Sequence, residues 1–349
     1  MCLHLTAVTA ALLPPTAAKV FGFVALPGAL GVDVFFVLSG FIISYNYEAW
    51  FVERVEPSKY LAFLRARLAR IYPVHLVLLV ALVAAVWGAG IDAASATAAD
   101  RWSTIALIES VVLIHAWLGH TDVWNAVSWS ISLEWLAYLL FPLMVRVARW
   151  IGRLPTLGAV AMLSLVAAVP AVRATVANAV PGTPALPPLQ IVSEFLVGCI
   201  VFQLFRKQRG HAGAARYPGL TFLAIVVGAA TLLHFGSSPA WIVLLVPPLL
   251  LGLAYGHGWL SRLFAHPILV YGGKISFALY MTHYLWLWVM HHTFPLATLA
   301  TASLPVRIGW VFAHALPMPV IAAAVYHVVE EPARHWLVAR RARPAVTSP

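Results

Sequence analysis

The stretch GVDVFFVLSGFIIS, residues 31–44, decides the fold class of this chain, because apart from Asp33 it suits the interior of a bilayer. A charged side chain at the centre of a membrane helix costs roughly 2.5–3.5 kcal/mol even on insertion scales, so Asp33 is a candidate functional residue. Alternatively, Asp33 lies at the membrane interface, after Pro27, Gly28 and Gly31, and caps the first turn of its helix. Both interpretations stay open at this point.

Composition extends this conclusion to all 349 residues. Apolar residues make up 62% of the chain and charged residues only 10%. We therefore predict an all-α fold, a polytopic integral membrane bundle of about ten transmembrane helices that includes an incomplete first helix. The apolar segments fall at about 27–46, 72–90, 104–119, 128–146, 155–172, 188–205, 217–234, 239–256, 272–291 and 307–328.

The formal charge of +10 is concentrated between apolar segments, which is typical of cytoplasmic loops and not of a nucleic-acid-binding domain. The clusters are Arg54, Lys59, Arg65, Arg67 and Arg70; Arg146, Arg149 and Arg153; Arg206, Lys207, Arg209 and Arg216; and Arg334, Arg340, Arg341 and Arg343. If all four clusters are cytoplasmic, the C-terminus is cytoplasmic too. The chain must then cross the membrane an even number of times between Arg70 and Arg146, so one of the three apolar segments there does not span. We predict that this is 104–119, which carries Glu109 and His115.

The domain organisation is simple. Residues 1–337 form one membrane domain and residues 338–349 a basic, disordered cytoplasmic tail. Residues 52–70 predict an amphipathic helix on the cytoplasmic surface, with leucines at helical spacing and arginines toward another side. One interpretation is that this helix only anchors the chain to the membrane surface.

Polar residues in the early apolar segments are candidates for function. They are His4, and Asp33 with Ser39 and Ser44. Gly40 and Ser44 also form a small-xxx-small pair, so close helix packing is the competing explanation for that serine.

The segment SWSISLEW, residues 128–135, begins a second polar face. Ser130, Glu134 and Tyr138 share one side of a helix, so an acidic residue points with two hydroxyls into one cavity. The alternative is a structural salt bridge from Glu134 to an arginine of a neighbouring helix.

The segment ISFALYMTHYLW, residues 275–286, places Ser276, Tyr280 and His283 on one face. A lone membrane histidine is more often a hydrogen-bonded core residue than a catalyst. Further along, Glu330 stands one turn from Tyr326, and we expect Pro332 to end that helix.

Several common motifs are absent from the sequence. It has no GxSxG elbow, P-loop, HExxH or dinucleotide fingerprint, and its two cysteines have no metal-ligand spacing, so we expect no metal site.

Five blocks resemble, in order and spacing, the acyltransferase-3 family of integral membrane acyltransferases. The blocks are GVDVFFVLSGFIIS (31–44), RARLARIYP (65–73), SWSISLEWLAYLLFP (128–142), ISFALYMTHYLW (275–286) and YHVVEEPARHWL (326–337). The resemblance implies transfer of an acyl group, commonly acetyl, from cytosolic acyl-CoA to a hydroxyl of a carbohydrate, lipid or secondary metabolite. It implies acyl-CoA as a co-substrate, no bound cofactor and a location in the inner (plasma) membrane.

In this family the first transmembrane helix ends with a histidine, and His4 occupies the matching place. The family also has a basic residue about ten positions earlier, whereas only three residues precede His4 here. The resemblance therefore implies a truncated start.

The implied mechanism assigns roles to these residues. His4 is the expected general base, Asp33 or Glu134 would orient its ring, and His283 is the rival base. Arg65, Arg67 and Arg70, with Tyr72, are expected to hold the phosphates of acyl-CoA. The expected supporting residues are Ser39, Ser130, Tyr280 and Glu330.

Two other classes stay open. Intramembrane Asp, Glu and His also suit a secondary transporter or proton-coupled flippase, although the sequence has no inverted repeat. A non-catalytic acyl-binding membrane protein is the third possibility.

Overall fold

The computed structural model describes residues 2–25, 30–90, 101–180, 186–208, 228, 239–255 and 259–339, and no strand occurs among them. Six helical stretches in this part of the chain are long and apolar enough to cross a membrane. They are Leu30–Trp50, Pro57–Gly88, Ala126–Arg153, Thr156–Ala177, Pro187–Lys207 and Leu304–Leu337. The predicted all-α, polytopic membrane fold is confirmed. The predicted segment 217–234 lies outside the described residues except for Gly228, as do residues 340–349 of the predicted tail.

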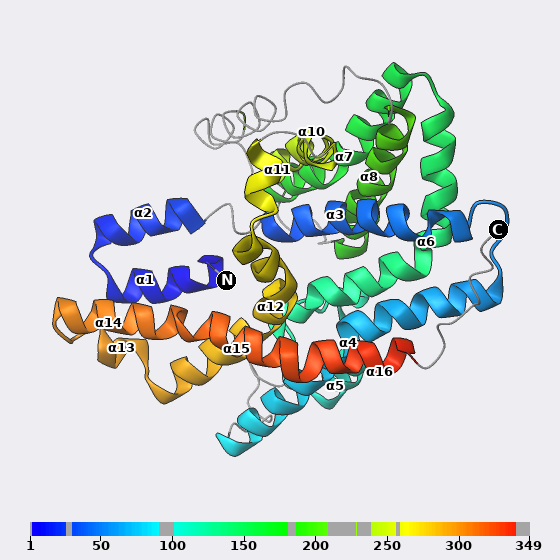
Figure 1. Cartoon of the computed structure of the whole chain (residues 1–349). Helices are drawn as coiled ribbons and strands as arrows, with labels where there is room; N and C mark the ends of the chain where they lie inside the picture. Colours follow the sequence, from blue (N-terminus) through cyan, green and yellow to red (C-terminus); the bar gives the residue numbers. More distant parts are fainter. Residues whose placement is uncertain are drawn as a thin grey trace.

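One group of helices is built around the contact between α3 (Leu30–Tyr47) and α8 (Pro187–Gln208). Figure 1 shows α3 crossing the middle of the molecule with α8 above its right half. A Cβ atom at Gly40 would lie 2.0 Å from the carbonyl oxygen of Phe195, and one at Gly198 would lie 2.0 Å from that of Val37. The two backbones touch because neither glycine has a side chain, which confirms close helix packing at Gly40.

Helices α6 (Trp129–Arg153) and α7 (Thr156–Ala179) complete this group by packing on α8. The 3-10 helix Pro239–Leu245 lies against α7, and α10 (Val246–Ala254) lies against α8.

Helix α4 spans Pro57–Gly88 without a break. The predicted amphipathic helix over 52–70 is therefore not a separate element: residues 57–70 form the first half of a membrane-length helix, and residues 52–56 precede it. Pro73 sits inside α4. Membrane helices tolerate proline because neighbouring groups can satisfy the carbonyl that loses its donor.

The predicted non-spanning segment 104–119 is not one helix. It contains α5 (Thr104–Val111), which has only 8 residues, and the 3-10 helix His115–Leu118. Leu113 has φ 59° and Trp124 has φ 39°. Such values are costly for side chains with a Cβ, so the surrounding packing holds this loop in place.

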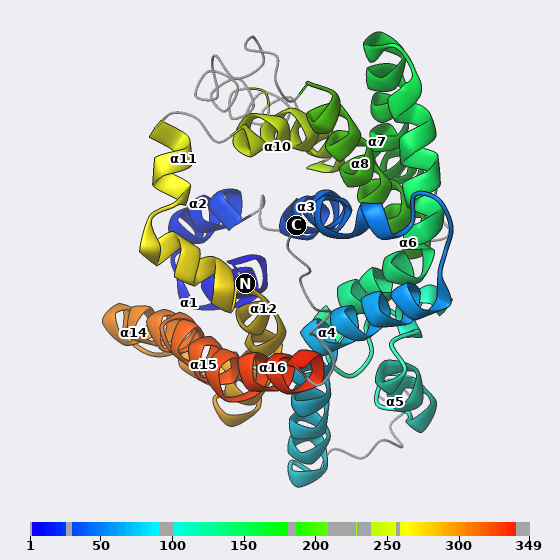
Figure 2. The ribbon, with the colours of Figure 1, turned by 45° about the vertical axis from the view of Figure 1, so that its right-hand side comes forward.

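The second group contains α12 (Pro267–Thr293), α14 (Leu304–Ala315), α15 (Pro317–Val325) and α16 (Glu331–Ala339). Helices α12 and α15 pack together, and α16 packs on α4, as the lower part of Figure 2 shows. α15 and α16 are joined by a π-helical turn, Tyr326–Glu330.

The prediction that Pro332 ends the last helix is wrong. Pro332 lies in the first turn of α16, and the chain stays helical to Ala339. A first-turn proline is tolerated because its missing N–H has no partner there in any case.

The N-terminal residues form the short helices α1 (Thr6–Leu12) and α2 (Pro15–Ala25), which pack on each other. Helix α1 also packs on α14, and both views show the pair beside the second group (Figures 1 and 2). Before α1, the 3-10 helix Cys2–Leu5 carries His4 toward α12. The short connections α11 (Trp259–Phe264) and α13 (Leu296–Leu299) flank α12 in the sequence.

Candidate active site

A polar seam follows the boundary between the two helix groups. Its members come from α3, α4, α6, α12 and the π turn, and they meet in an otherwise apolar interior. The seam consists of Ser39, Arg67, Arg70, Ser130, Glu134, Tyr138, Tyr280, His283 and Glu330.

A pair of histidines lies at one end of the seam. The ring centroids of His4 and His283 are 4.9 Å apart. His4 is exposed, whereas His283 is fully buried. Nδ1 of His283 lies 2.6 Å from the backbone carbonyl of Tyr280, so this nitrogen carries the hydrogen and donates it. Nε2 of His283 is buried and has no hydrogen-bond partner among the described residues.

The next part of the seam joins α12 to α6. The Ser130 hydroxyl lies 2.8 Å from the Tyr280 hydroxyl, which in turn donates to the carbonyl of Val127 at 2.8 Å. The side-chain amide of Asn125 donates to the carbonyl of Met281 at 3.4 Å. The strained loop before α6 is thus fastened to the turn of α12 that carries His283.

Glu134 lies at the centre of the seam and is buried. Tyr138 donates a very short hydrogen bond to one carboxylate oxygen, and Ser39 donates to the same oxygen at 3.2 Å. The other oxygen is buried without a partner among the described residues. The charges of Arg67 and Arg70 act on Glu134 from α4, but no salt bridge to Glu134 is formed in the described part of the chain. The predicted shared face of Ser130, Glu134 and Tyr138 is confirmed.

Two arginines close the other end of the seam. Arg70 forms an ion pair with the buried carboxylate of Glu330, and its guanidinium lies over the ring of Phe277 at 5.3 Å. Arg67 donates to the hydroxyl of Tyr47 at 3.0 Å. The π-helical turn that carries Glu330 re-aims this carboxylate toward α4, a use often made of such bulges.

The other two residues predicted to bind acyl-CoA lie elsewhere on α4. Arg67 and Arg70 are three residues apart and share a face, whereas Arg65 is about 200° from Arg67 around the helix. Arg65 is exposed, and Tyr72 lies on its side of the helix, with its ring 6.3 Å from that of His75. Of the four residues predicted to bind acyl-CoA, the structure therefore brings together only Arg67 and Arg70.

Asp33 is not part of the seam. Gln190 of α8 donates to its carboxylate at 2.8 Å, and the carboxyl group of Glu194 lies close to it. Glu194 is fully buried and Arg173 of α7 lies near both acids. Sequence reasoning missed Glu194, although an acidic residue within the apolar segment 188–205 was the same signal that singled out Asp33.

The remaining polar candidates have local partners. Ser276 is exposed and donates to the carbonyl of Gly273, so it does not share the environment of Tyr280 and His283. His292 is exposed and stacks on Trp288 at 3.9 Å. No group of three or more His, Cys, Asp or Glu side chains in the described ranges is arranged to hold a metal ion.

These features define the class of the molecule: a multi-pass membrane protein with ionisable and hydroxyl side chains gathered between two helix groups. The chain belongs to the acyltransferase 3 family, because the family model described as "Acyltransferase domain" matches residues 2–326. It is 29% identical over 353 residues to acyltransferase MdmB of Streptomyces mycarofaciens, an alignment that covers 92% of this chain and 84% of that protein. No solved structure matches it. The chain is therefore an enzyme, a membrane acyltransferase.

Proposed function

We propose that this enzyme moves an acyl group, in the first instance acetyl, from acyl-CoA to a hydroxyl of a carbohydrate, lipid or secondary metabolite, with His4 as general base. The observation that carries the proposal is the histidine pair. Nδ1 of His283 donates to a backbone carbonyl, Nε2 has no partner among the described residues, and the ring of His4 lies 4.9 Å away between centroids.

Accessibility decides between the two histidines. A base must reach the acceptor hydroxyl, and His4 is exposed while His283 is fully buried. Centroids 4.9 Å apart leave ring nitrogens within reach of one another when the edges turn together. His283 is then a positioning residue whose Nε2 accepts the N–H of His4 and fixes its tautomer. This replaces the predicted orienting role of Asp33 and Glu134, whose carboxylates have other partners.

The chemical step balances without a bound cofactor. A ring nitrogen of His4 takes the hydroxyl proton as the acceptor oxygen attacks the thioester carbonyl carbon. The tetrahedral intermediate collapses with cleavage of the C–S bond, and His4 returns the proton to the sulfur as CoA leaves. The ester stays on the acceptor and His4 is regenerated.

The donor enters at the arginine end of the seam. Arg67 and Arg70 supply two guanidinium groups on one face of α4, a suitable arrangement for phosphate oxygens. We assign the arginine end to the cytoplasm of the plasma membrane, because basic residues cluster at the corresponding loop ends and CoA is cytosolic. The C-terminus is cytoplasmic on the same argument.

Purified protein in lipid nanodiscs, incubated with radiolabelled acetyl-CoA, tests this function. Release of free CoA that depends on an added polyhydroxylated acceptor is the expected result. Tight binding of acetyl-CoA without turnover for every acceptor would contradict it and favour a binding protein.

Removal of the two seam arginines tests the donor site. In the R67Q and R70Q variants we expect the KM for acetyl-CoA to rise at least tenfold. The matched control is R65Q, which removes the same charge from the opposite side of α4 and is expected to leave KM within about twofold. An equal effect at all three positions would contradict the assignment.

A further inference from the structure

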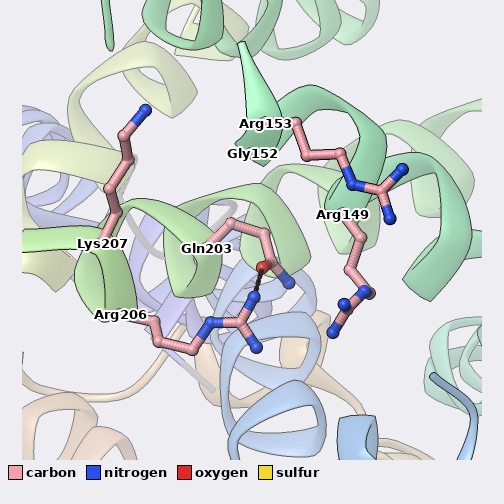
Figure 3. A pocket seen from close by; sticks show the side chains of 6 residues that line it. All are labelled: Arg149, Gly152, Arg153, Gln203, Arg206 and Lys207. Carbon is pink, nitrogen blue, oxygen red and sulfur yellow. Dashed lines mark hydrogen bonds between the residues drawn. The ribbon is translucent and has the colours of Figure 1, made fainter. Parts of the chain in front are cut away.

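A cavity of about 310 Å³ opens at the ends of α6 and α8, and none of its lining residues belongs to the polar seam. Figure 3 shows the side chains around it, with Arg149 and Arg153 on one wall and Arg206 and Lys207 on the other. Its volume equals that of roughly ten water molecules in the liquid, enough for a phosphate group and a few attached carbon atoms. We call it the basic pocket.

The floor of the basic pocket is fixed by a buried carboxylate. Glu48 accepts from Arg149 at 3.0 Å and from Arg206 at 3.2 Å through one oxygen, and from Gln203 at 3.0 Å through the other. Gln203 also accepts from Arg206 at 2.7 Å, the bond drawn in Figure 3. A Cβ at Gly152 would lie 2.9 Å from that of Gln203, so the glycine allows the two walls to approach. The arginines are therefore held in position before any ligand arrives.

The charges in the basic pocket do not balance. Four cationic side chains line it and the single carboxylate beneath them neutralises one charge. Favourable interaction with a helix C-terminus accounts for Lys207, whose ammonium donates to the carbonyl of Leu154 at 2.8 Å. It does not account for Arg153, which lines the cavity and has no hydrogen bond or ion pair among the described residues. The pocket is thus suited to an anion.

The surroundings of the basic pocket are those of a membrane surface. Trp150 is 56% exposed beside Arg149, as expected for a tryptophan at the headgroup level. Leu143 and Val147 continue an exposed apolar stripe from Trp150 along α6. Leu157, in the first turn of α7, is 82% exposed. Apolar side chains exposed on this scale suit acyl chains and not water.

We propose that the basic pocket binds the phosphate headgroup of a net-anionic membrane phospholipid, whose acyl chains lie along the exposed stripe of α6. This site and the proposed donor site have no lining residue in common, although Tyr47, which accepts from Arg67, directly precedes Glu48, which accepts from Arg149 and Arg206. The excess positive charge favours a headgroup with net negative charge over a zwitterionic one.

Lipid titration of purified protein in neutral detergent tests the proposal. The probes are phosphatidylglycerol and phosphatidylcholine, and the readouts are Kd and unfolding temperature. We expect tighter binding and a larger thermal shift with phosphatidylglycerol. The R153Q variant should weaken that binding about fivefold, the effect of one cation near a membrane surface.

The control is R146Q, which removes the same charge from α6 at an exposed position outside the pocket. We expect it to change Kd less than twofold. Both variants should keep the wild-type unfolding temperature in phosphatidylcholine, which shows that they fold.

Two further arms separate lipid from soluble phosphate. Inorganic phosphate and CoA are added without lipid, and neither should reproduce an Arg153-dependent shift. A shift from either that R153Q abolishes would overturn the lipid assignment. Equal losses in R153Q and R146Q, or no preference for phosphatidylglycerol, would overturn the pocket itself. The Kd for acetyl-CoA, measured in parallel, should be unchanged in R153Q, so the outcome is independent of the donor-site proposal.

Discussion

Substitution of Gly40 by alanine should force α3 and α8 apart. The added Cβ would stand 2.0 Å from the carbonyl oxygen of Phe195, and ordinary contact begins near 3.4 Å, so a shift of about 1.4 Å is needed. The atom in the way is backbone and cannot rotate aside. A gap of only 0.5–1 Å already forfeits a quarter to a half of the dispersion energy of the contacts it opens, so we expect a loss of about 3 kcal/mol of stability.

Gly31 provides the matched control on the same helix. A Cβ at Gly31 meets nothing within 4 Å, so G31A should be neutral or slightly stabilising. Cys199 reports on the contact directly, because its buried thiol lies 3.7 Å from the carbonyl oxygen of Gly40. In a C2S background, thiol labelling of Cys199 during a thermal ramp should begin at a clearly lower temperature in G40A. Unchanged labelling in G40A, or equal losses in both variants, would refute the packing argument.

Three further predictions concern charged and polar groups. R70M and E330L should each lower the free energy of unfolding by about 2–3 kcal/mol, because either single change leaves a buried charge unpaired. The double variant should lose less than the sum of the two, and additive losses in a thermal double-mutant cycle would contradict this. E48Q should lower the unfolding temperature because two arginines lose their shared anion, and an unchanged temperature would argue against that cluster. Burial lowers the pKa of His115 to about 4, below its value in the unfolded chain. The resulting contribution to the free energy of unfolding, about 3 kcal/mol, is fully present above pH 6.5 and should disappear as pH falls toward 4. The pH dependence of unfolding should be weaker in H115Q than in the wild type over that range. The same pH dependence in both proteins would contradict the lowered pKa.

Local helical patterns were readable from the sequence because they depend only on spacing. The common face of Ser130, Glu134 and Tyr138 follows from 3.6 residues per turn, and the structure confirms it. The partners of that face were not readable. Ser39 reaches Glu134 across 95 positions of the chain, and a helix pattern carries no information on such pairings.

The errors concern backbone continuity and long-range charge pairing. Pro332 was taken as a helix end, yet the chain stays helical to Ala339, because a proline in the first turn of α16 lacks an N–H that has no partner there in any case. The distance between Asp33 and His4 in space could not be judged from sequence, since Asp33 instead finds its partners on α8. The sequence predicted close packing at Gly40 from a small-xxx-small pair, but it did not indicate that α8 is the helix that Gly40 meets.

The most direct test of the catalytic account is single-turnover acyl transfer by histidine variants. Labelled acetyl-CoA and acceptor are mixed with H4A, H283Q and the exposed control H292A, and acylated product is followed over pH. H4A should lose about 10²–10⁴-fold in rate, H283Q should lose less and shift the pH profile, and H292A should match the wild type. Full activity in H4A together with abolished activity in H283Q would contradict His4 as the base.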